Sequence, residues 1–347
     1  MNKPTLSTRQ TLMRLAFIAL IPLLLIALML WVGGWLTPER LTSDKLVTAL
    51  QQAGGHHPGY RRNHAKGVCI FGDFTSSGQA ATLSRAALFA PGVTPVVGRF
   101  AIAGGNPGAP DYAVPVRSMA LAFYQKDGEQ WRTGMNAMPF FPVQSVQGFY
   151  DLQVATLPDK QSGKPDPAKV QAFVQQHPEI KPFFAWAKQY VPSSSWIRDR
   201  FNSINAFNFI DAAGHSHLVR WSMVPHAKYQ PAEAQEKKDA NFLSNDLQQR
   251  LAQGPQQWDL IVTVAGPQDR GDDATVAWPA DRQTINAGTL TISRTTPQQA
   301  GACNDINYDP LILPDGITAS DDPLLSARSS AYAKSYHART HEQAEAQ

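Results

Sequence analysis

The sequence lacks the short motifs that identify several large enzyme classes. No GxGxxG, GxxxxGK[ST], HExxH or GxSxG pattern occurs in its 347 residues. The common dinucleotide-binding, P-loop, zinc-protease and esterase signatures are therefore excluded. The sequence also has no basic block, and its formal net charge is only +3, so nucleic acid is not an expected partner. No fixed-period repeat is present, which argues against a solenoid or a propeller.

Cysteine is scarce, and the two cysteines, Cys69 and Cys303, do not form a CxxC pair. Two distant thiols are expected to be buried and unreactive. A disulfide between them would require Cα atoms within about 7 Å, which the sequence alone does not decide.

Candidate metal ligands are few. His215 and His217 flank one serine on a predicted hairpin, and His56 and His57 are adjacent. We recognise no Cys or carboxylate ligand beside either pair, so solvated surface positions are expected rather than a metal site.

The composition is that of a globular protein with many connections. Hydrophobic residues make up 43% and aromatic residues 10%, enough for one large domain or two modest ones. The 26 prolines and 24 glycines favour a fold with many turns over a helical bundle.

Residues 15–36 form an uncharged apolar run that is predicted to be a transmembrane anchor. The run of about 22 residues would be roughly 33 Å long as a helix, which matches the hydrocarbon core of a bilayer. A membrane helix tolerates Pro22, and Trp31 and Trp35 lie where an aromatic belt forms. The run exceeds a typical signal-peptide core and no A-x-A site follows it directly, so an uncleaved anchor is favoured over a signal peptide.

The flanks of this run predict its orientation. Lys3, Arg9 and Arg14 precede it, so residues 1–14 are expected in the cytoplasm and the rest of the chain is expected to be exported. The localisation predicted is thus a single pass through the inner membrane, with the main domain on the periplasmic side. Residues 37–57 are interpreted as a tether and a short helix, Ser43 to Gly54.

Residues 58–347 show strands paired through local turns, with helices inserted as separate blocks, which favours an antiparallel α+β architecture. Hairpins are predicted from Met119 to Asn136 and from Ile204 to Val224. Further strands are predicted at 67–74, 94–103, 258–265 and 288–294, and helices at 79–89, 168–176, 180–190 and 232–253.

Four sequence blocks resemble the signatures of the haem catalases. The first, Arg61-Arg62-Asn63-His64-Ala65-Lys66-Gly67, is similar to R-x-x-H-A-K-G. The others are Val97-Gly98-Arg99-Phe100, the segment 134–141 (compare G-N-N-T-P-x-F-F), and 314–332 (compare P-x-G-I-x-x-S followed by R-x-x-x-Y). They occur in the family's order and span residues 58–340. The resemblance implies an antiparallel β-barrel with surrounding helices and a haem b held in the domain.

The resemblance also implies roles for individual residues. His64 matches the distal acid–base that transfers a proton between the two peroxide oxygens, a role that suits imidazole. Tyr332 matches the phenolate ligand of the iron, and Arg328, one helical turn earlier, would help it ionise. The expected cofactor contacts are completed by propionate-binding Arg61, Arg99 and Arg339 and by Phe140 and Phe141 near the distal face.

Several positions depart from the family pattern. Met135 stands where a distal Asn is usual, with Asn136 one place further on, and Ala101 replaces a Ser that supports the distal His. Pro115 falls near a channel Asp, and Asn63 replaces a small apolar residue. Because oxidation of a second peroxide needs pre-placed polar groups, these changes should damage catalase turnover most.

The sequence therefore predicts a haem peroxidase of the catalase-related kind. It would reduce hydrogen peroxide or organic hydroperoxides with small organic electron donors, in an antioxidant role and without NADPH. One alternative is a true catalase with weak turnover, which Asn136 over the haem would favour. The others are a haem-binding or sensing protein without turnover and an enzyme that rearranges fatty-acid hydroperoxides.

Overall fold

The computed structural model describes residues 7–33, 35–37, 39–159, 161–299 and 301–345. It divides into one unit that ends at Leu46 and a second that begins at Val47. Each unit is considered by itself.

The first unit contains one long apolar helix, α1 (Thr8–Val32). Ser7 caps its N-terminus in a capping box with Gln10, and the helix ends at Gly33. Among the described residues it is the one helix long and apolar enough to cross a membrane by length and composition. The helix begins and ends earlier than residues 15–36, so Trp35 and Leu36 lie beyond its end. The short helix α2 (Ser43–Gly54) has the bounds that the sequence predicts.

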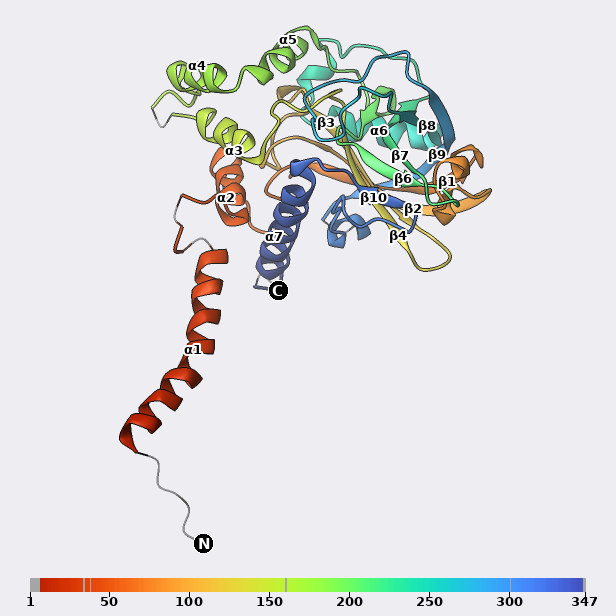
Figure 1. Ribbon diagram of the computed structural model, residues 1–347. Helices are drawn as coiled ribbons and strands as arrows, with labels where there is room; N and C mark the ends of the chain where they lie inside the picture. Colours follow the sequence, from red (N-terminus) through yellow and green to blue (C-terminus); the bar gives the residue numbers. More distant parts are fainter. Residues whose placement is uncertain (1–6, 34, 38, 160, 300, 346–347) are drawn as a thin grey trace. The chain divides into compact units, whose positions relative to one another are not determined.

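The second unit is built on a closed antiparallel β-barrel, as predicted (Figure 1). Eight strands form the ring in the order β7-β5-β4-β3-β2-β1-β9-β8, and pairing of β8 with β7 closes it. Two short strands, β6 and β10, extend the sheet beside β7. The strands are β1 (Gly67–Ser76), β2 (Gly92–Ile102), β3 (Arg117–Tyr124), β4 (Gln130–Asn136), β5 (Phe201–Asn202), β6 (Phe207–Ile210), β7 (Ser216–Pro225), β8 (Gln256–Val264), β9 (Thr284–Pro297) and β10 (Ile317–Ala319).

The barrel interior is packed with aromatic side chains. Trp131, Trp221 and Trp258 are fully buried there, and Phe100 and Phe123 stack in the same cluster. Residues on these strands alternate between the inside and the outside of the barrel. The interior is therefore filled, and any large ligand must bind on the outer face.

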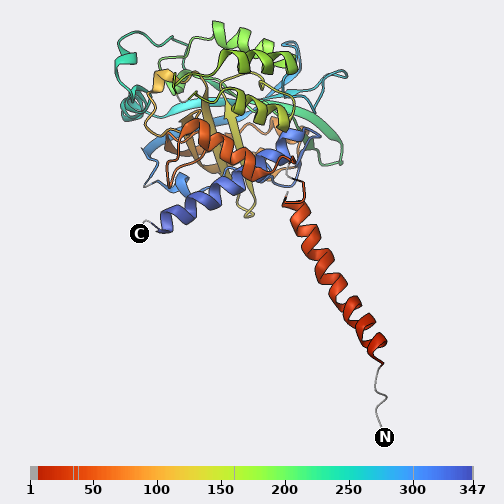
Figure 2. The same ribbon diagram turned by 90° about the vertical axis from the view of Figure 1, so that its left-hand side faces the viewer.

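Helices cover the outside of the barrel (Figures 1 and 2). The α-helices of this part are α3 (Val146–Ala155), α4 (Pro167–Gln176), α5 (Lys181–Gln189), α6 (Phe242–Gln253) and α7 (Pro323–Glu345). The short 3-10 helices are η1 (Gln79–Thr82), η2 (Ala87–Phe89), η3 (Asp111–Ala113), η4 (Pro178–Ile180), η5 (Trp196–Arg198), η6 (Glu236–Lys238) and η7 (Ala302–Asp305). In both views α7 lies along one side of the barrel, and α3, α4 and α5 form a separate group.

Two predicted helices are only partly present. The segment 79–89 contains η1 and η2 instead of one helix. Between these two elements the Ser84 hydroxyl donates to the Gly316 carbonyl and accepts from the Ala86 amide, which interrupts the helical hydrogen bonding. The segment 232–253 contains the short η6 (Glu236–Lys238) and is α-helical only from Phe242 onward, where the buried stripe of Leu243 and Leu247 begins. Both hairpins and the other predicted strands are present.

Candidate functional site

The outer face of β1–β4 carries two rows of aligned residues, here called the platform. The strand register places Gly67, Ala101, Ser118 and Asn136 in the first row and Cys69, Arg99, Ala120 and Gly134 in the second. Most of these side chains are small, so covering elements can approach the backbone of the platform closely, as Tyr332 does at Gly134.

His64 lies on the loop just before β1. Its backbone has a φ of 54°, the left-handed region that non-glycine residues rarely adopt. Asn63 supports this turn, because its side-chain Oδ1 accepts hydrogen bonds from the His64 amide at 2.9 Å and the Gly104 amide at 2.7 Å. The polar Asn63, a departure at the sequence level, thus has a defined role in holding the His64 loop.

A serine hydroxyl contacts the imidazole of His64. Ser118 Oγ lies 2.9 Å from His64 Nδ1 and donates a short hydrogen bond to Asn136 Oδ1. Because the hydroxyl donates its single hydrogen to Asn136, Ser118 can accept from a protonated Nδ1, the tautomer that leaves Nε2 as the basic nitrogen. The expectation that His64 lacks a hydroxyl partner because of Ala101 was wrong. Ser118, directly opposite Ala101 in the next strand, supplies it.

The neighbouring position on β4 is also settled. Met135 points into the barrel core and is 1% exposed, whereas Asn136 faces outward beside Ser118. Asn136 therefore lies on the His64 side of the platform.

The environment of His64 keeps its imidazole neutral. Burial, together with the positive charges of Arg99 and Arg328, lowers the pKa of His64 to about 3. The Ile102 carbonyl opposes this shift. At neutral pH the side chain is therefore a neutral base.

Three arginines predicted to bind propionates converge beside the platform. Arg61 donates to the Cys303, Asn304 and Ile306 carbonyls at 3.0, 3.3 and 3.0 Å. Arg339 donates to the Asn304 carbonyl at 2.6 Å, and Arg99 to the His64 carbonyl at 2.9 Å and the Gln298 side chain. The hydrogen-bond acceptors of these guanidinium groups among the described residues are neutral oxygens, not carboxylates.

The positive charge of this arginine cluster (Arg61, Arg99 and Arg339) is only partly compensated, with Asp305 as the carboxylate that interacts with Arg339. Burial, with the charges of Arg99 and Arg339, holds the pKa of Arg61 well below its usual value, and burial chiefly lowers that of Arg99 to about 10. Arg61 Nη1, Arg99 Nε and Arg339 Nε are buried without hydrogen-bond partners. Buried cations of this kind require an anion. The cluster therefore fits a ligand with carboxylate groups.

Arg328 and Tyr332 face the second row of the platform from α7. Arg328 donates to the Gly134 carbonyl at 3.2 Å and to Asn205 Oδ1, and its guanidinium lies 5.9 Å from the centre of the Tyr332 ring. A Cβ on Gly134 would lie 3.3 Å from Tyr332 Oη, so glycine at this position leaves room for the phenol. Tyr332 also interacts electrostatically with Arg61 and Arg99. The structure thus brings together the predicted residues of both halves of the site.

The C-terminal helix is attached to the His64 loop. Glu342 forms an ion pair with Arg62, which is 6% exposed, and accepts from the Gly59 amide at 2.8 Å. Ser335 accepts from the Arg62 amide at 3.3 Å. These contacts fix α7, and with it Tyr332, against the loop that carries His64.

Cys69 and Cys303 are buried, as expected, but they form a disulfide instead of two free thiols, a question that the sequence left open. The bond joins the second row of the platform to η7, across 234 residues of sequence, with Cα atoms 5.4 Å apart. Sequence could not show this proximity, because nothing local connects the two segments.

The remaining candidates have separate contacts. The Phe141 ring packs against Phe149 at 5.5 Å, between the clusters under α3 and α5, and Phe140 is half-buried. The carboxylate of Asp211 contacts both His215 and His217, so this pair does have a carboxylate partner close by in sequence. No group of three or more His, Cys, Asp or Glu suited to a metal occurs among the described residues.

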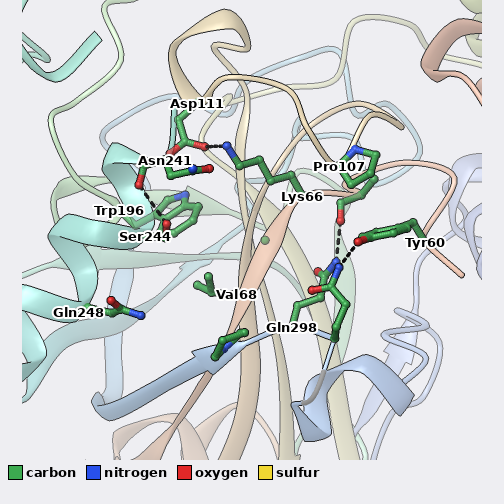
Figure 3. A pocket seen from close by; sticks show the side chains of 14 residues that line it. Tyr60, Lys66, Val68, Pro107, Asp111, Trp196, Asn241, Ser244, Gln248 and Gln298 are labelled. Atoms are coloured by element: carbon green, nitrogen blue, oxygen red, sulfur yellow. Dashed lines mark hydrogen bonds and ion pairs between the residues drawn. The ribbon is translucent and has the colours of Figure 1, made fainter. Parts of the chain in front are cut away.

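A pocket of about 240 Å³ is lined by residues that include Lys66, Asp111 and Gln298 (Figure 3). Lys66 Nζ and Asp111 Oδ1 form an ion pair of 2.8 Å in it, and Trp196 lies beside them. Gln298 lines the same pocket and links it to the cluster by contacting both Arg99 and the Ala65 carbonyl. The pocket thus borders the site.

Comparison with known proteins agrees with this geometry. The catalase family model matches residues 41–345. The chain is 41% identical to "Catalase-related peroxidase" of Synechococcus elongatus (86% of this chain, 89% of the relative). It is 32% identical to the protein of the same name from Mycolicibacterium paratuberculosis (86% and 95%).

Solved structures share the fold. A structure titled "Structure of a bacterial catalase" superposes with a TM-score of 0.72 at 24% identity and covers 82% of this chain. The chain spans 58% of the length of that protein. Because the family model covers most of the sequence and two relatives exceed 30% identity over nearly their whole length, the chain belongs to the catalase family.

Proposed function

We propose that this chain is a haem-dependent peroxidase that reduces hydrogen peroxide or organic hydroperoxides with small organic electron donors, in an antioxidant role. The observation that carries the proposal is a neutral His64, held by Ser118, in one site with Tyr332 and an only partly compensated arginine cluster. Membership of the catalase family supports an oxidoreductase acting on peroxide. The names of the two relatives described above support the peroxidase activity.

The arginine cluster supports haem b as the cofactor. Haem carries two propionates, which would accept from the buried nitrogens of Arg61, Arg99 and Arg339 and neutralise their charge. Tyr332 would be the iron ligand, with Arg328 stabilising its phenolate. Phe140 and Phe141 would contribute aromatic surface near the distal side. When bound, the haem iron supplies the electron exchange with peroxide.

His64 would transfer the proton. Its Nδ1–H is held by Ser118, so Nε2 would take the proton from one peroxide oxygen and return it to the other as the O–O bond breaks. Asn63 and the Ser118–Asn136 pair fix the position of the imidazole.

The location proposed is the inner membrane, with α1 as a single-pass anchor and residues 58–347 as an exported haem domain. The length and composition of α1 support the anchor. The basic residues before it support a cytoplasmic N-terminus. The Cys69–Cys303 disulfide supports export, since such bonds persist in oxidising compartments.

A second candidate is a true catalase. Asn136 lies on the His64 side of the platform and Ser118 supplies the hydroxyl, so two polar features linked to catalase turnover are present after all. The exposed Pro115 still provides no carboxylate where the family has a channel Asp.

One assay separates the two activities. The full chain in detergent, loaded with haem, receives a fixed dose of hydrogen peroxide with an oxidisable phenol, and oxygen release and phenol oxidation are followed together. Mostly oxidised phenol supports the peroxidase. Mostly oxygen supports the catalase, and no turnover with a normal haem spectrum contradicts both.

A further inference from the structure

The Cys69–Cys303 disulfide joins the platform to the chain segment that binds two of the clustered arginines. Cys69 and Cys303 are both fully buried. Cys303 belongs to η7, and the carbonyls of Cys303, Asn304 and Ile306 accept the hydrogen bonds of Arg61 and Arg339. The sulfur bridge and the arginine-binding carbonyls therefore belong to one short segment, 303–306.

Few other bonds attach η7 to the barrel. Among the described residues, the backbone hydrogen bonds of η7 and its N-cap Gly301 are local, from the Asn304 amide to the Gly301 carbonyl and from the Gly301 amide to the Gln298 carbonyl. Ile306 and Tyr308 pack near the disulfide but lie beyond η7. The disulfide is thus the covalent tie between β1 and the segment that carries the carbonyls of Cys303 and Asn304.

At Gly301 the backbone passes close to the Cys69–Cys303 disulfide. A Cβ on Gly301 would lie 2.4 Å from Cys69 Sγ and 2.7 Å from the Pro297 carbonyl oxygen. No larger residue fits without moving the backbone, so the approach of this segment to Cys69 is a specific feature of the fold.

We propose that the Cys69–Cys303 disulfide positions the haem-binding arginines, so that its reduction loosens the cofactor. Arg61 and Arg339 repel each other and depend on the 303–306 carbonyls for acceptors. With the bridge open, the segment can move from the barrel, and both guanidinium groups lose these acceptors. This inference rests on the proposed haem function.

A dithiol can reduce the Cys69–Cys303 disulfide in two exchange steps. A thiolate of the reductant attacks one sulfur, which breaks the protein S–S bond, forms a mixed disulfide and frees the other cysteine. The second thiol of the reductant then attacks the mixed disulfide and frees the remaining cysteine. The protein gains two electrons and two protons as two thiols, and the reductant becomes a cyclic disulfide. Because both sulfurs are buried, variants provide a test that does not depend on access.

The experiment measures haem transfer from the full chain in detergent to excess apomyoglobin. We compare the wild type, the Cys69→Ala/Cys303→Ala variant, and Asp269→Asn, which breaks the Arg282 ion pair away from the site. Thermal unfolding of each protein is recorded alongside. The double cysteine variant should release haem about tenfold faster or more, since hydrogen bonds to charged groups are among the stronger ones. Asp269→Asn should release it at the wild-type rate.

Each outcome decides the matter. Equal release by the wild type and the cysteine variant, or release that follows thermal stability across all three proteins, overturns the positioning role but leaves the proposed function intact. A wild type that retains no haem overturns both. If the variant does not fold, the wild type is measured before and after dithiothreitol, with thiols counted by mass after alkylation. Unchanged release from the reduced protein then overturns the proposal.

Discussion

Ser118 Oγ lies 2.9 Å from His64 Nδ1, and the two residues belong to segments separated by the whole of β1 and β2. The hydroxyl comes from the strand next to the one in which the family pattern has it. The substitution Ser118→Ala removes this hydroxyl and should slow the reaction of the haem-loaded protein with peroxide about tenfold. This factor corresponds to the free energy of one oriented hydrogen bond. Stopped-flow absorbance measures this rate. Adding Ala101→Ser should recover part of it, and a Ser118→Ala protein as fast as wild type would remove Ser118 from this role.

Replacing His64 tests proton transfer itself. His64→Ala should retain haem but react with peroxide about 10²–10⁴-fold more slowly, as expected for loss of a general acid–base. His226→Ala is the matched control, because His226 pairs with Asp259 on β8 at the barrel surface. An unchanged rate in His64→Ala would exclude the proposed role.

The pH dependence follows from the low pKa of His64. With a pKa of about 3 the imidazole is neutral above about pH 4, so the rate of the peroxide reaction should be flat from pH 5 to pH 8. Bound propionates would offset the arginine charges and raise the pKa, but burial still keeps it below the usual 6.5. If the rate instead fell as the pH was lowered, with a midpoint at pH 6.5 or above, the buried, positively charged environment assigned to His64 would be contradicted.

The lowered pKa of His64 also makes the stability of the protein depend on pH. The folded pKa lies below the unfolded one, so the unfolded chain binds the extra proton and stability is lost as the pH falls from 6.5 towards 3. The wild type should lose up to about 1.4 kcal/mol more per pH unit across this window than His64→Ala, measured by urea unfolding. Parallel pH curves for the two proteins would disprove the shift.

Tyr332→Phe should weaken haem retention, because the anionic ligand is removed while the ring is kept. The haem content after purification and the absorption spectrum report this directly. Tyr336→Phe, one turn further along α7, is the control and should keep normal haem. An unchanged spectrum in Tyr332→Phe would show that another group binds the iron.

Asn63→Ala should destabilise the loop that holds His64. Two backbone amides, of His64 and Gly104, would lose their acceptor, at a cost of about 1–3 kcal/mol. Asn63→Asp keeps an acceptor oxygen and should be milder. Thermal unfolding of both variants compares them, and equal melting temperatures would mean that the side-chain contacts contribute little.

The sequence predicts the local parts of this fold well. The hairpin around Lys126-Asp127-Gly128 is present, and its register pairs Ser118 with Asn136. That pairing was already implied by a turn centred on Asp127, so the hydroxyl beside Asn136 could have been recognised. Closure of the barrel could not, because the pairings of β1 with β9 and β7 with β8 join distant segments.

The residues of the site likewise divide into those that the sequence predicts and those that depend on contacts between distant segments. His64, Tyr332 and the four arginines were found because their blocks resemble a known family, and the structure places them together. The disulfide and the carbonyls that bind Arg61 were missed, because they depend on a contact between β1 and η7 that has no sequence pattern. Asn63 was noticed only as a departure, since its function depends on the backbone of Gly104.

The two halves of the site come from opposite ends of the described chain. His64 and the platform precede or belong to β1–β4, whereas Tyr332 and Arg339 belong to α7, the last element described. During synthesis the barrel strands β1–β4 emerge long before α7, and domains fold as their segments become available. If Tyr332 binds the haem iron as proposed, the cofactor is loaded only after α7 has docked through Glu342 onto Arg62. Haem insertion would then select chains that contain α7, because a chain truncated before Tyr332 lacks the proposed iron ligand.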